Sequence, residues 1–378
     1  MFTKKSKRKK FLFILNTDKF LLSHRIEIAN KLIKNNYEVH LGSAQTESSK
    51  VINDLGIKTH NISINRTRIG LISLIKTTIS IYRLIKKINP DIVHFVSIKP
   101  IILGCIATKF YKKNLKIIVS ISGLGFIFID RNFLAYFKRL ITCLLYKFSL
   151  TNKKIKVIFQ NKTDRDFIKN ICNLSKSQYI IINGSGVNLE RFKPIKEIHF
   201  KKEKIVLLPA RIVKSKGIYE FIKSAKKLKG KAKFILCGDF DYEAKDSIYF
   251  EEIKFWVKNS TIDYIGYKTN MEDIIAQSSI VVLPSYREGL PKVLCEAAAC
   301  GIPVITTNVP GCSDAIIDQQ TGILVPPRES EELSLAIISL LKNPERLKKM
   351  GEAGRRLAEE KYDIKKIVNT HMKLYRNI

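Results

Sequence analysis

The sequence predicts an α/β protein with two doubly wound parallel-sheet domains that face each other across a cleft. Short apolar runs that suit strands alternate with segments of helical periodicity along the chain. The alternation comes in two cycles, which a segment rich in Gly and Asn separates. The length of 378 residues is also more than one ordinary core holds, and this favours two domains.

The two cycles place the expected elements in order. The first begins with a strand and a helix near 23–35, and its strands are expected at 11–15, 38–42, 91–96, 116–120 and 157–160. The second ends in helices after Glu329, and its strands are expected at 204–208, 233–237, 262–264, 280–283 and 303–306. A strand followed by a helix is the pattern of parallel sheets with crossover helices.

The segment from Asn183 to Pro194 is typical of a hinge. We therefore expect an N-terminal domain over 1–192, a C-terminal domain over 193–360, and a last helix over 361–378 that crosses back to the first domain. Ligands of open α/β sheets bind at the carboxyl ends of the strands, so the cleft between the domains is the expected site.

The charge of the chain is concentrated in its first half. Residues 1–200 carry 37 Lys and Arg against 11 Asp and Glu, whereas residues 201–378 carry 30 against 23. Such asymmetry indicates an acidic partner, either a nucleic acid or an anionic membrane surface.

Two segments favour the membrane. Residues 1–10 form a basic tail, and residues 131–147 interleave basic side chains with large apolar ones at a spacing that suits an amphipathic helix in the headgroup layer. The alternative for 131–147 is a helix that faces the core and leaves its lysines in water.

Nothing in the sequence predicts a membrane span. No uninterrupted apolar segment reaches the ~18 residues that a span needs, and the apolar run 11–15 suits a strand and not a signal peptide. Seven cysteines without C-x-x-C spacing are typical of reduced thiols. We therefore expect a cytoplasmic protein that meets the membrane from its cytoplasmic side.

The most informative stretch is S-Y-R-E-G-L-P-K-V-L-C-E, residues 285–296. It follows an apolar run, places Glu288 beside Gly289, and enters a helix at Pro291. Glu288 and Glu296 can hold sugar and ribose hydroxyls, while the backbone amides from Gly289 through Leu290 to Lys292 and the helix dipole face a phosphate. The alternative is a capped surface helix, but the whole string favours a nucleotide-sugar site.

Arg211 and Lys216 follow the first strand of the second cycle, in P-A-R-I-V-K-S-K-G. Two fixed cations in a dry cleft would stabilise the negative charge that develops on a departing diphosphate. The alternative for either residue is an ordinary solvated charge. Their position at a strand end, in the domain that also carries the two glutamates, favours a role at the site.

The strings A-R-x-V-x-x-K-G, P-S-x-x-E-G-x-P-x-x-x-x-E-A, G-x-P-V-I-x-T and G-V-N-x-x-x-F resemble the retaining glycosyltransferases of family 4. More narrowly, residues 20–25, 121–125 and 310–315 are similar to bacterial enzymes that add an N-acetylhexosamine, often N-acetylgalactosamine, to a sugar linked to undecaprenyl diphosphate. The resemblance implies the GT-B fold, with two Rossmann-like domains.

By this resemblance Arg211 and Lys216 would hold the diphosphate of a UDP-sugar, Glu296 the ribose and Glu288 the sugar. It also implies retention of the anomeric configuration, no cofactor and no essential metal. The acceptor would be a lipid-diphosphate-linked sugar in surface polysaccharide or glycan synthesis, such as O-antigen or capsule.

In the first domain, His94 stands where the family commonly has a histidine facing the donor, at the predicted end of the strand from Asp91. A core role is the alternative for a lone histidine. Lys99, just past that strand, is a candidate for an acceptor phosphate, with a plain surface lysine as its alternative. His24 and Arg25 are further acceptor-side candidates, because the loop after the first strand lacks the glycines that many family members place there.

The sequence leaves three other interpretations to consider. Asp239 and Asp241 have the D-x-D spacing of a metal site, but two acids without a third ligand seldom bind a metal. A nucleotide-sugar 2-epimerase shares the architecture but needs further acid and histidine residues. A nucleic-acid-binding protein fits only the charge, because the basic residues lack the aromatic interleaving of a single-strand platform.

Overall fold

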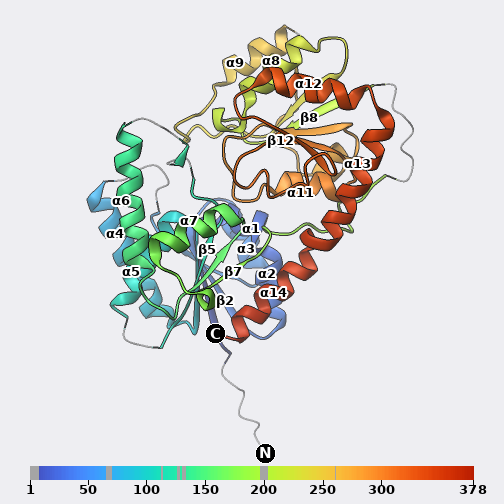
Figure 1. The fold of residues 1–378 in the computed structure, drawn as a ribbon. Coiled ribbons are helices and arrows are strands. Elements are labelled where there is room, and N and C mark those ends of the chain that lie inside the picture. The colour runs from blue at the N-terminus through green and yellow to red at the C-terminus, as the bar shows by residue number, and fades with distance from the viewer. Residues whose placement is uncertain are drawn as a thin grey trace, which may run out of the picture. The chain divides into compact units, whose positions relative to one another are not determined.

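The computed structural model describes residues 8–64, 70–111, 114–125, 128–129, 133–195, 203–259 and 261–378. The chain forms two compact units: unit 1 comprises residues 1–182 and 367–378, and unit 2 comprises residues 183–366 (Figure 1). The division therefore falls after residue 182 and not after 192. The Gly- and Asn-rich segment 183–194 belongs to unit 2, and the end of the last helix belongs to unit 1.

Unit 1 contains a parallel sheet of seven strands in the order β3-β2-β1-β4-β5-β6-β7. These strands are β1 (Lys10–Thr17), β2 (Glu38–Ala44), β3 (Lys58–Asn61), β4 (Ile92–Val96), β5 (Lys116–Ile121), β6 (Lys156–Phe159) and β7 (Tyr179–Ile181). The predicted strands of the first cycle are confirmed. The edge strands β3 and β7 were not predicted, because they are short and β3 reads K-T-H-N, with no apolar residue.

Helices pack on the sheet of unit 1, and the last of them, α14, comes from the C-terminal end of the chain. They are α1 (Asp18–His24), α2 (Ile26–Lys34), α3 (Ser48–Asp54), α4 (Leu71–Ile88), α5 (Ile98–Lys109), α6 (Phe133–Ser149), α7 (Lys162–Cys172) and α14 (Ile364–Arg376). The single helix predicted near 23–35 is two, since the chain breaks helical geometry at Arg25.

Unit 2 contains a parallel sheet of six strands in the order β10-β9-β8-β11-β12-β13. They are β8 (Ile205–Pro209), β9 (Lys233–Cys237), β10 (Asp263–Tyr264), β11 (Ile280–Leu283), β12 (Val304–Thr307) and β13 (Gly322–Val325). The helices are α8 (Ile218–Lys227), α9 (Phe250–Lys258), α10 (Met271–Ala276), α11 (Lys292–Ala299), α12 (Ser330–Leu341) and α13 (Pro344–Leu357). The prediction of two doubly wound parallel sheets is confirmed.

Both sheets have helices on their two faces, so their central strands are apolar along their whole length. In β1 the run Phe11–Leu15 is buried, and in β11 all of Ile280–Leu283 is buried. This double burial explains why these strands read as continuous apolar runs and could be located from the sequence. Within the described residues, no helix is long and apolar enough to cross a membrane.

Candidate functional site

Three neighbouring strands of unit 2 bring the predicted site residues to one edge of its sheet. In the order β9-β8-β11 the strands are parallel, so their carboxyl ends lie side by side. The loop after β8 carries Arg211 and Lys216, the loop after β11 carries Glu288, and the loop after β9 carries Asp241. The edge where ligands of open α/β sheets bind therefore has both predicted cations.

Lys216 and Glu288 form an ion pair across two of these loops. Their side chains are only 18% and 14% exposed, so water screens the attraction less than it would at the surface. Tyr286 N also donates to Ser215 O at 2.9 Å and ties the same loops together. The structure thus brings together the cation and the carboxylate that the sequence singled out.

Two glycines allow the backbone to pack tightly around this pair. Gly217 has a φ of +73°, and a Cβ there would lie 2.3 Å from Pro284 O. Gly311 has a φ of +85°, and a Cβ there would lie 2.4 Å from Glu288 O. Only glycine meets both demands at each position. The loops after β8 and β11 are therefore held against each other, and Glu288 has a fixed backbone position.

Arg211 forms an ion pair with an acid that follows β9. Its Nη1 atom contacts Asp241, the second acid of the D-x-D spacing, and its side chain is about half exposed. Asp241 therefore serves as a counter-charge for Arg211. Among the described residues, no group of three or more His, Cys, Asp or Glu side chains is placed to hold a metal ion.

Glu296 lies in the second turn of α11 and is almost completely buried. Lys292, one turn earlier, places its Nζ atom 3.2 Å from Glu296 Oε1. Burial raises the pKa of Glu296 above its usual range, while the nearby Lys292 charge opposes that rise. Gly289, Leu290 and Pro291, which lead into this helix, are buried as well. The predicted ribose ligand is thus a constrained carboxyl group and not a solvated one.

Three residues beside the site have contacts that the sequence pattern does not reveal. Tyr286 donates its hydroxyl to Glu220 Oε1 at 2.8 Å, and the Arg328 guanidinium lies 4.7 Å from the centre of the Tyr286 ring. Burial raises the pKa of Tyr286 well above its usual range, which keeps the phenol protonated. Arg328 follows β13 with a φ of +67°. Arg328 is far along the chain from the E-G-L-P string, so no motif in the sequence could have predicted its contact with Tyr286.

In unit 1, His94 occupies the core position that was its alternative. The strand β4 runs on to Val96, so His94 is an interior residue of the strand and not its end. Its Nε2 atom is 2.6 Å from Ser120 Oγ, its Nδ1 atom is 2.9 Å from the Tyr375 hydroxyl, and the side chain has no exposed surface. Both ring nitrogens are satisfied within unit 1, and this geometry argues against contact with a substrate.

The acceptor candidates of unit 1 are placed in three different ways. Arg25 is 1% exposed and donates to His24 O at 3.0 Å, so its guanidinium cannot meet an acceptor in this conformation and that prediction is corrected. His24 is partly exposed, stacks on Phe20 and lies 2.6 Å from Ser23 Oγ. Lys99 is partly exposed near the start of α5. The roles of His24 and Lys99 stay predictions.

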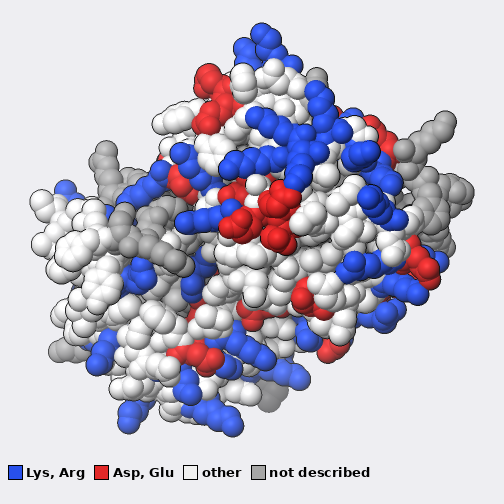
Figure 2. All heavy atoms as spheres, turned by 45° about the horizontal axis from the view of Figure 1, so that its top comes forward, with Lys and Arg blue, Asp and Glu red and all other residues white. Residues whose placement is uncertain are grey.

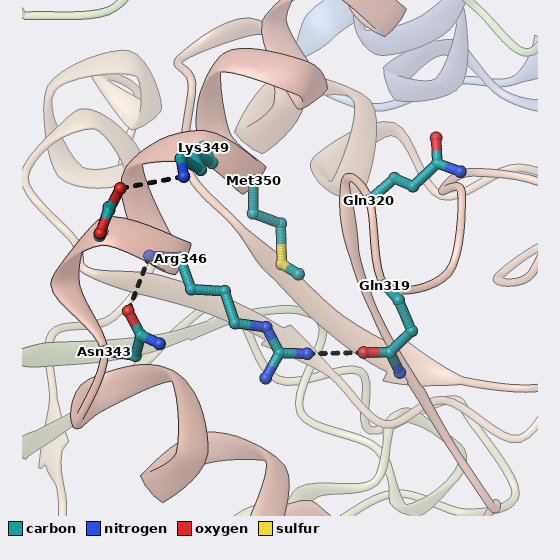
Figure 3. A pocket seen from close by; sticks show the side chains of 7 residues that line it. Gln319, Gln320, Asn343, Arg346, Lys349 and Met350 are labelled. Carbon is teal, nitrogen blue, oxygen red and sulfur yellow. Dashed lines mark hydrogen bonds and ion pairs between the residues drawn. The ribbon is translucent and has the colours of Figure 1, made fainter.

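A hollow on the surface of unit 2 contains none of the predicted site residues. It has a volume of about 440 Å³ and is lined by Gln319, Gln320, Asn343, Glu345, Arg346, Lys349 and Met350. Arg346 crosses it to donate to Gln319 Oε1 at 2.6 Å (Figure 3). The hollow lies at the start of α13, whereas the residues singled out by sequence follow β8 and β11.

Two family models match the chain, one in each half. The model described as "Glycosyl transferase 4-like" matches residues 10–161, and the model described as "Glycosyl transferases group 1" matches residues 190–357. The second match includes every residue of the site around Lys216 and Glu288.

Two curated relatives act on sugars linked to undecaprenyl diphosphate. The chain is 28% identical to the N,N'-diacetylbacillosaminyl-diphospho-undecaprenol alpha-1,3-N-acetylgalactosaminyltransferase of Campylobacter jejuni, over 96% of this chain and 97% of that protein. It is 27% identical to the UDP-Gal:alpha-D-GlcNAc-diphosphoundecaprenol alpha-1,3-galactosyltransferase of Escherichia coli, over 71% of each.

The fold is also that of solved glycosyltransferases. The structure of Anabaena HepE in complex with UDP-glucose matches with a TM-score of 0.77 at 16% identity, covering 98% of this chain and 100% of that one. At this identity the likeness concerns the fold alone. The predicted GT-B arrangement of two Rossmann-like parallel-sheet domains is confirmed.

Proposed function

Since the chain belongs to the glycosyltransferases, with a glycosyl transferase 4-like first half and a group 1 second half, we propose that it transfers a sugar from a UDP-sugar to a sugar linked to undecaprenyl diphosphate. The two curated relatives named above act on acceptors of this class, and one uses a UDP-sugar. The donor that we propose is a UDP-N-acetylhexosamine, because the Campylobacter jejuni relative, which aligns over 96% of this chain, transfers N-acetylgalactosamine.

The observation that carries the proposal is the Lys216–Glu288 pair at the carboxyl edge of the unit 2 sheet. In the proposed reaction the bond between the sugar C1 atom and the diphosphate oxygen breaks, and the acceptor hydroxyl oxygen bonds to C1. The hydroxyl proton passes to the departing phosphate, and UDP leaves. Lys216 and Arg211 stabilise the charge that grows on the diphosphate, because a fixed cation in a partly dry site needs no reorganisation.

The carboxylates have complementary parts in this proposal. Glu288 is held by backbone contacts and can accept hydrogen bonds from sugar hydroxyls while it orients Lys216. Glu296 stands on α11 and accepts from the ribose. Attack from the same face as the leaving phosphate gives retention of the anomeric configuration. The proposed pathway is bacterial surface polysaccharide or glycan synthesis, at the inner face of the cytoplasmic membrane, where the lipid-linked acceptor is held.

The test is a panel of UDP-sugars incubated with a lipid-diphosphate-linked sugar, with UDP release and product mass both measured. The proposal predicts UDP release that depends on the acceptor, together with a product heavier by one sugar, and retention seen in the anomeric NMR coupling. Isomerised donor without a new product would instead mean epimerisation, which the transferase relatives do not support. Release of UDP without the acceptor would mean hydrolysis.

A further inference from the structure

The helix α6 is amphipathic in the reverse of the usual sense. The side chains that it buries are Ala135, Thr142, Tyr146 and Ser149. Most of its large apolar side chains are exposed instead: Phe133, which is 84% exposed, and Leu134, Tyr136, Phe137, Leu140, Ile141, Leu144 and Phe148. A surface helix normally buries its apolar face. For the described residues 133–147, the alternative of a core-facing helix fits only the face around Tyr146, and most of the apolar side chains lie outside it.

The first half of α4 shows the same feature. Its exposed side chains include Leu71, Ile72, Ile75 and Ile79, whereas from Ile81 onward its apolar side chains are mostly buried. The helix α5 packs against both α4 and α6, so the two outward apolar surfaces flank one helix on the same side of unit 1 (Figure 1). We call these exposed residues of α4 and α6 the α4–α6 face. It gathers more exposed apolar side chains in one place than the single, scattered ones of an ordinary protein surface.

The charges of this face have one sign. The helices α4, α5 and α6 contain no Asp or Glu, and α4 and α6 together carry Lys76, Arg83, Lys86, Lys87, Lys138, Arg139 and Lys147. Lys109 of α5 lies over the Phe148 ring at 3.4 Å and donates to Phe148 O at 2.7 Å, which fastens α5 to α6. At the left margin of Figure 2 the described residues are mostly white and blue.

A second exposed apolar group, on α9 of unit 2, provides the contrast. There Tyr249, Phe250 and Phe255 are exposed, but Glu251 and Glu252 stand among them. Carboxylates beside the apolar side chains would be repelled by an anionic surface. The absence of acids on α4–α6, together with its apolar content, therefore distinguishes that face by its chemistry and not only by exposure.

We propose that the α4–α6 face docks on an anionic lipid bilayer, with its apolar side chains in the headgroup and acyl boundary and its lysines and arginines at acidic headgroups. A second copy of the chain is disfavoured as the occupant, because pairing two such faces brings cations against cations. The docking gives the proposed function its access to a lipid-linked acceptor, and in that respect it rests on the proposed function. The binding itself does not require donor or catalysis.

The experiment measures co-sedimentation of the full chain with vesicles in the absence of nucleotide-sugar. One set of vesicles contains phosphatidylglycerol and phosphatidylethanolamine, and the other contains phosphatidylcholine alone. The variants are Phe137→Ser with Leu144→Ser on α6, Ile72→Ser with Ile75→Ser on α4, and, as a matched control, Phe255→Ser with Val257→Ser on α9. All six side chains are exposed, so an unchanged melting temperature shows that each fold is intact.

We expect the parent chain to bind the anionic vesicles and to bind the neutral ones much less. The α6 pair should lower the partition coefficient by at least about tenfold, since two apolar anchors are lost. The α4 pair should lower it several-fold, and the α9 pair should leave it within about twofold. Raising the salt concentration should weaken the binding of the parent.

Undiminished binding of the α6 and α4 pairs overturns the proposal, as does loss of binding only when residues 1–10 are deleted. A parent dimer that the α6 pair splits, without any vesicle binding, assigns the face to self-association and also overturns it. Transfer to an acceptor that lacks the lipid tail separates this proposal from the proposed function. If the α6 variant no longer binds vesicles but still transfers sugar to this acceptor, both proposals hold. If even the parent transfers no sugar, only the proposed function fails.

Discussion

His94 in unit 1 and Glu288 in unit 2 make an instructive pair, because both were placed near strand ends and predicted to meet the substrate. His94 lies inside β4, has no exposed surface, and is hydrogen-bonded on both ring nitrogens to Ser120 and Tyr375. Glu288 lies in the loop after β11, is partly exposed, and faces Lys216. Whether a polar side chain lies inside the strand or in the loop after it decides whether it packs in the core or can meet a ligand. For His94 the difference is the two further strand residues up to Val96.

The same contrast holds for their charges. In unit 1, His94, His371 and Tyr375 are buried beside Arg25, and burial lowers the pKa of both histidines well below the usual range. In unit 2 the corresponding residues form two ion pairs, Arg211 with Asp241 and Lys216 with Glu288, in loops that water partly reaches. A buried, internally hydrogen-bonded cluster specifies packing, whereas an accessible pair of opposite charges can exchange partners with a ligand. The predictions below separate these two roles.

The largest effect is expected for Lys216→Ala. The substitution should lower kcat/KM by on the order of a hundredfold or more, because a cation that acts on the departing diphosphate is lost. Steady-state kinetics with the best donor measure this. Lys227→Ala is the control, since Lys227 also pairs with a carboxylate in unit 2 but is half exposed on α8. Equal kinetics for both variants would remove Lys216 from the mechanism.

Glu288→Gln should have the next largest effect, a loss on the order of tenfold in kcat/KM. The amide keeps the shape but no longer holds the Lys216 ammonium by charge, and it accepts hydrogen bonds from sugar hydroxyls less strongly. The rate should fall with little change in the melting temperature. A large fall in stability with normal kinetics would instead make the pair structural, like the His94 cluster.

Tyr375→Phe should affect stability and not chemistry. Removing the hydroxyl leaves His94 Nδ1 and His371 Nδ1 without the partner that joins them, at 2.9 and 3.2 Å, which costs about 1–3 kcal/mol of unfolding free energy. Chemical denaturation measures the loss, with exposed Lys373→Ala on the same helix as control. A kcat that drops in parallel for Tyr375→Phe, measured where the variant is fully folded, would restore His94 to the reaction.

Two buried groups, His94 in unit 1 and Glu296 in unit 2, should make contributions to stability that depend on pH with opposite signs. A buried histidine with a lowered pKa resists protonation when folded, so its contribution to stability is lost as pH falls through the unfolded value of about 6.5. Glu296 has a raised pKa, so the folded state favours its protonated form and stability is lost as pH rises through that value. The melting temperature of Glu296→Gln, relative to the parent, should therefore increase with pH. A difference that is constant between pH 4 and 8 would contradict this.

The smallest effect concerns Asp241. Replacing it with Asn removes the counter-charge of Arg211, and a diphosphate then has less competition for the guanidinium. Because Arg211 is about half exposed and screened by water, UDP affinity should rise by only about twofold to threefold. Titration calorimetry measures it. Weaker UDP binding would mean that Asp241 helps to hold the nucleotide.

Much of the fold could be predicted because strands buried on both faces are apolar throughout, as in 11–15 and 280–283. The edge strands β3, β7 and β13 were not predicted, whereas β10, which is also a short edge strand, was. The position of the domain boundary was also wrong. Gly and Asn mark turns wherever they occur, and Gly184 is needed inside unit 2, where a Cβ would lie 2.9 Å from Leu290.

The sequence could single out Glu288, Glu296 and the Arg211–Lys216 segment because each stands in a short local motif; their roles stay predictions. Contacts between distant segments could not be predicted. Asp241 was considered for a metal, but its partner is Arg211, and the approach of Arg328 to Tyr286 depends on a left-handed backbone conformation that no spacing encodes. Arg25 was proposed for the acceptor side from its place after the first strand, whereas it is buried beside His371 and Tyr375.

The central claim is that Arg211 and Lys216, at the carboxyl edge of the unit 2 sheet, bind the nucleotide diphosphate. Titration of UDP into the parent, into the double variant Arg211→Ala with Lys216→Ala, and into Lys227→Ala tests it directly. We expect a dissociation constant raised at least about tenfold for the double variant and unchanged for the control. Equal affinity in all three proteins would contradict it.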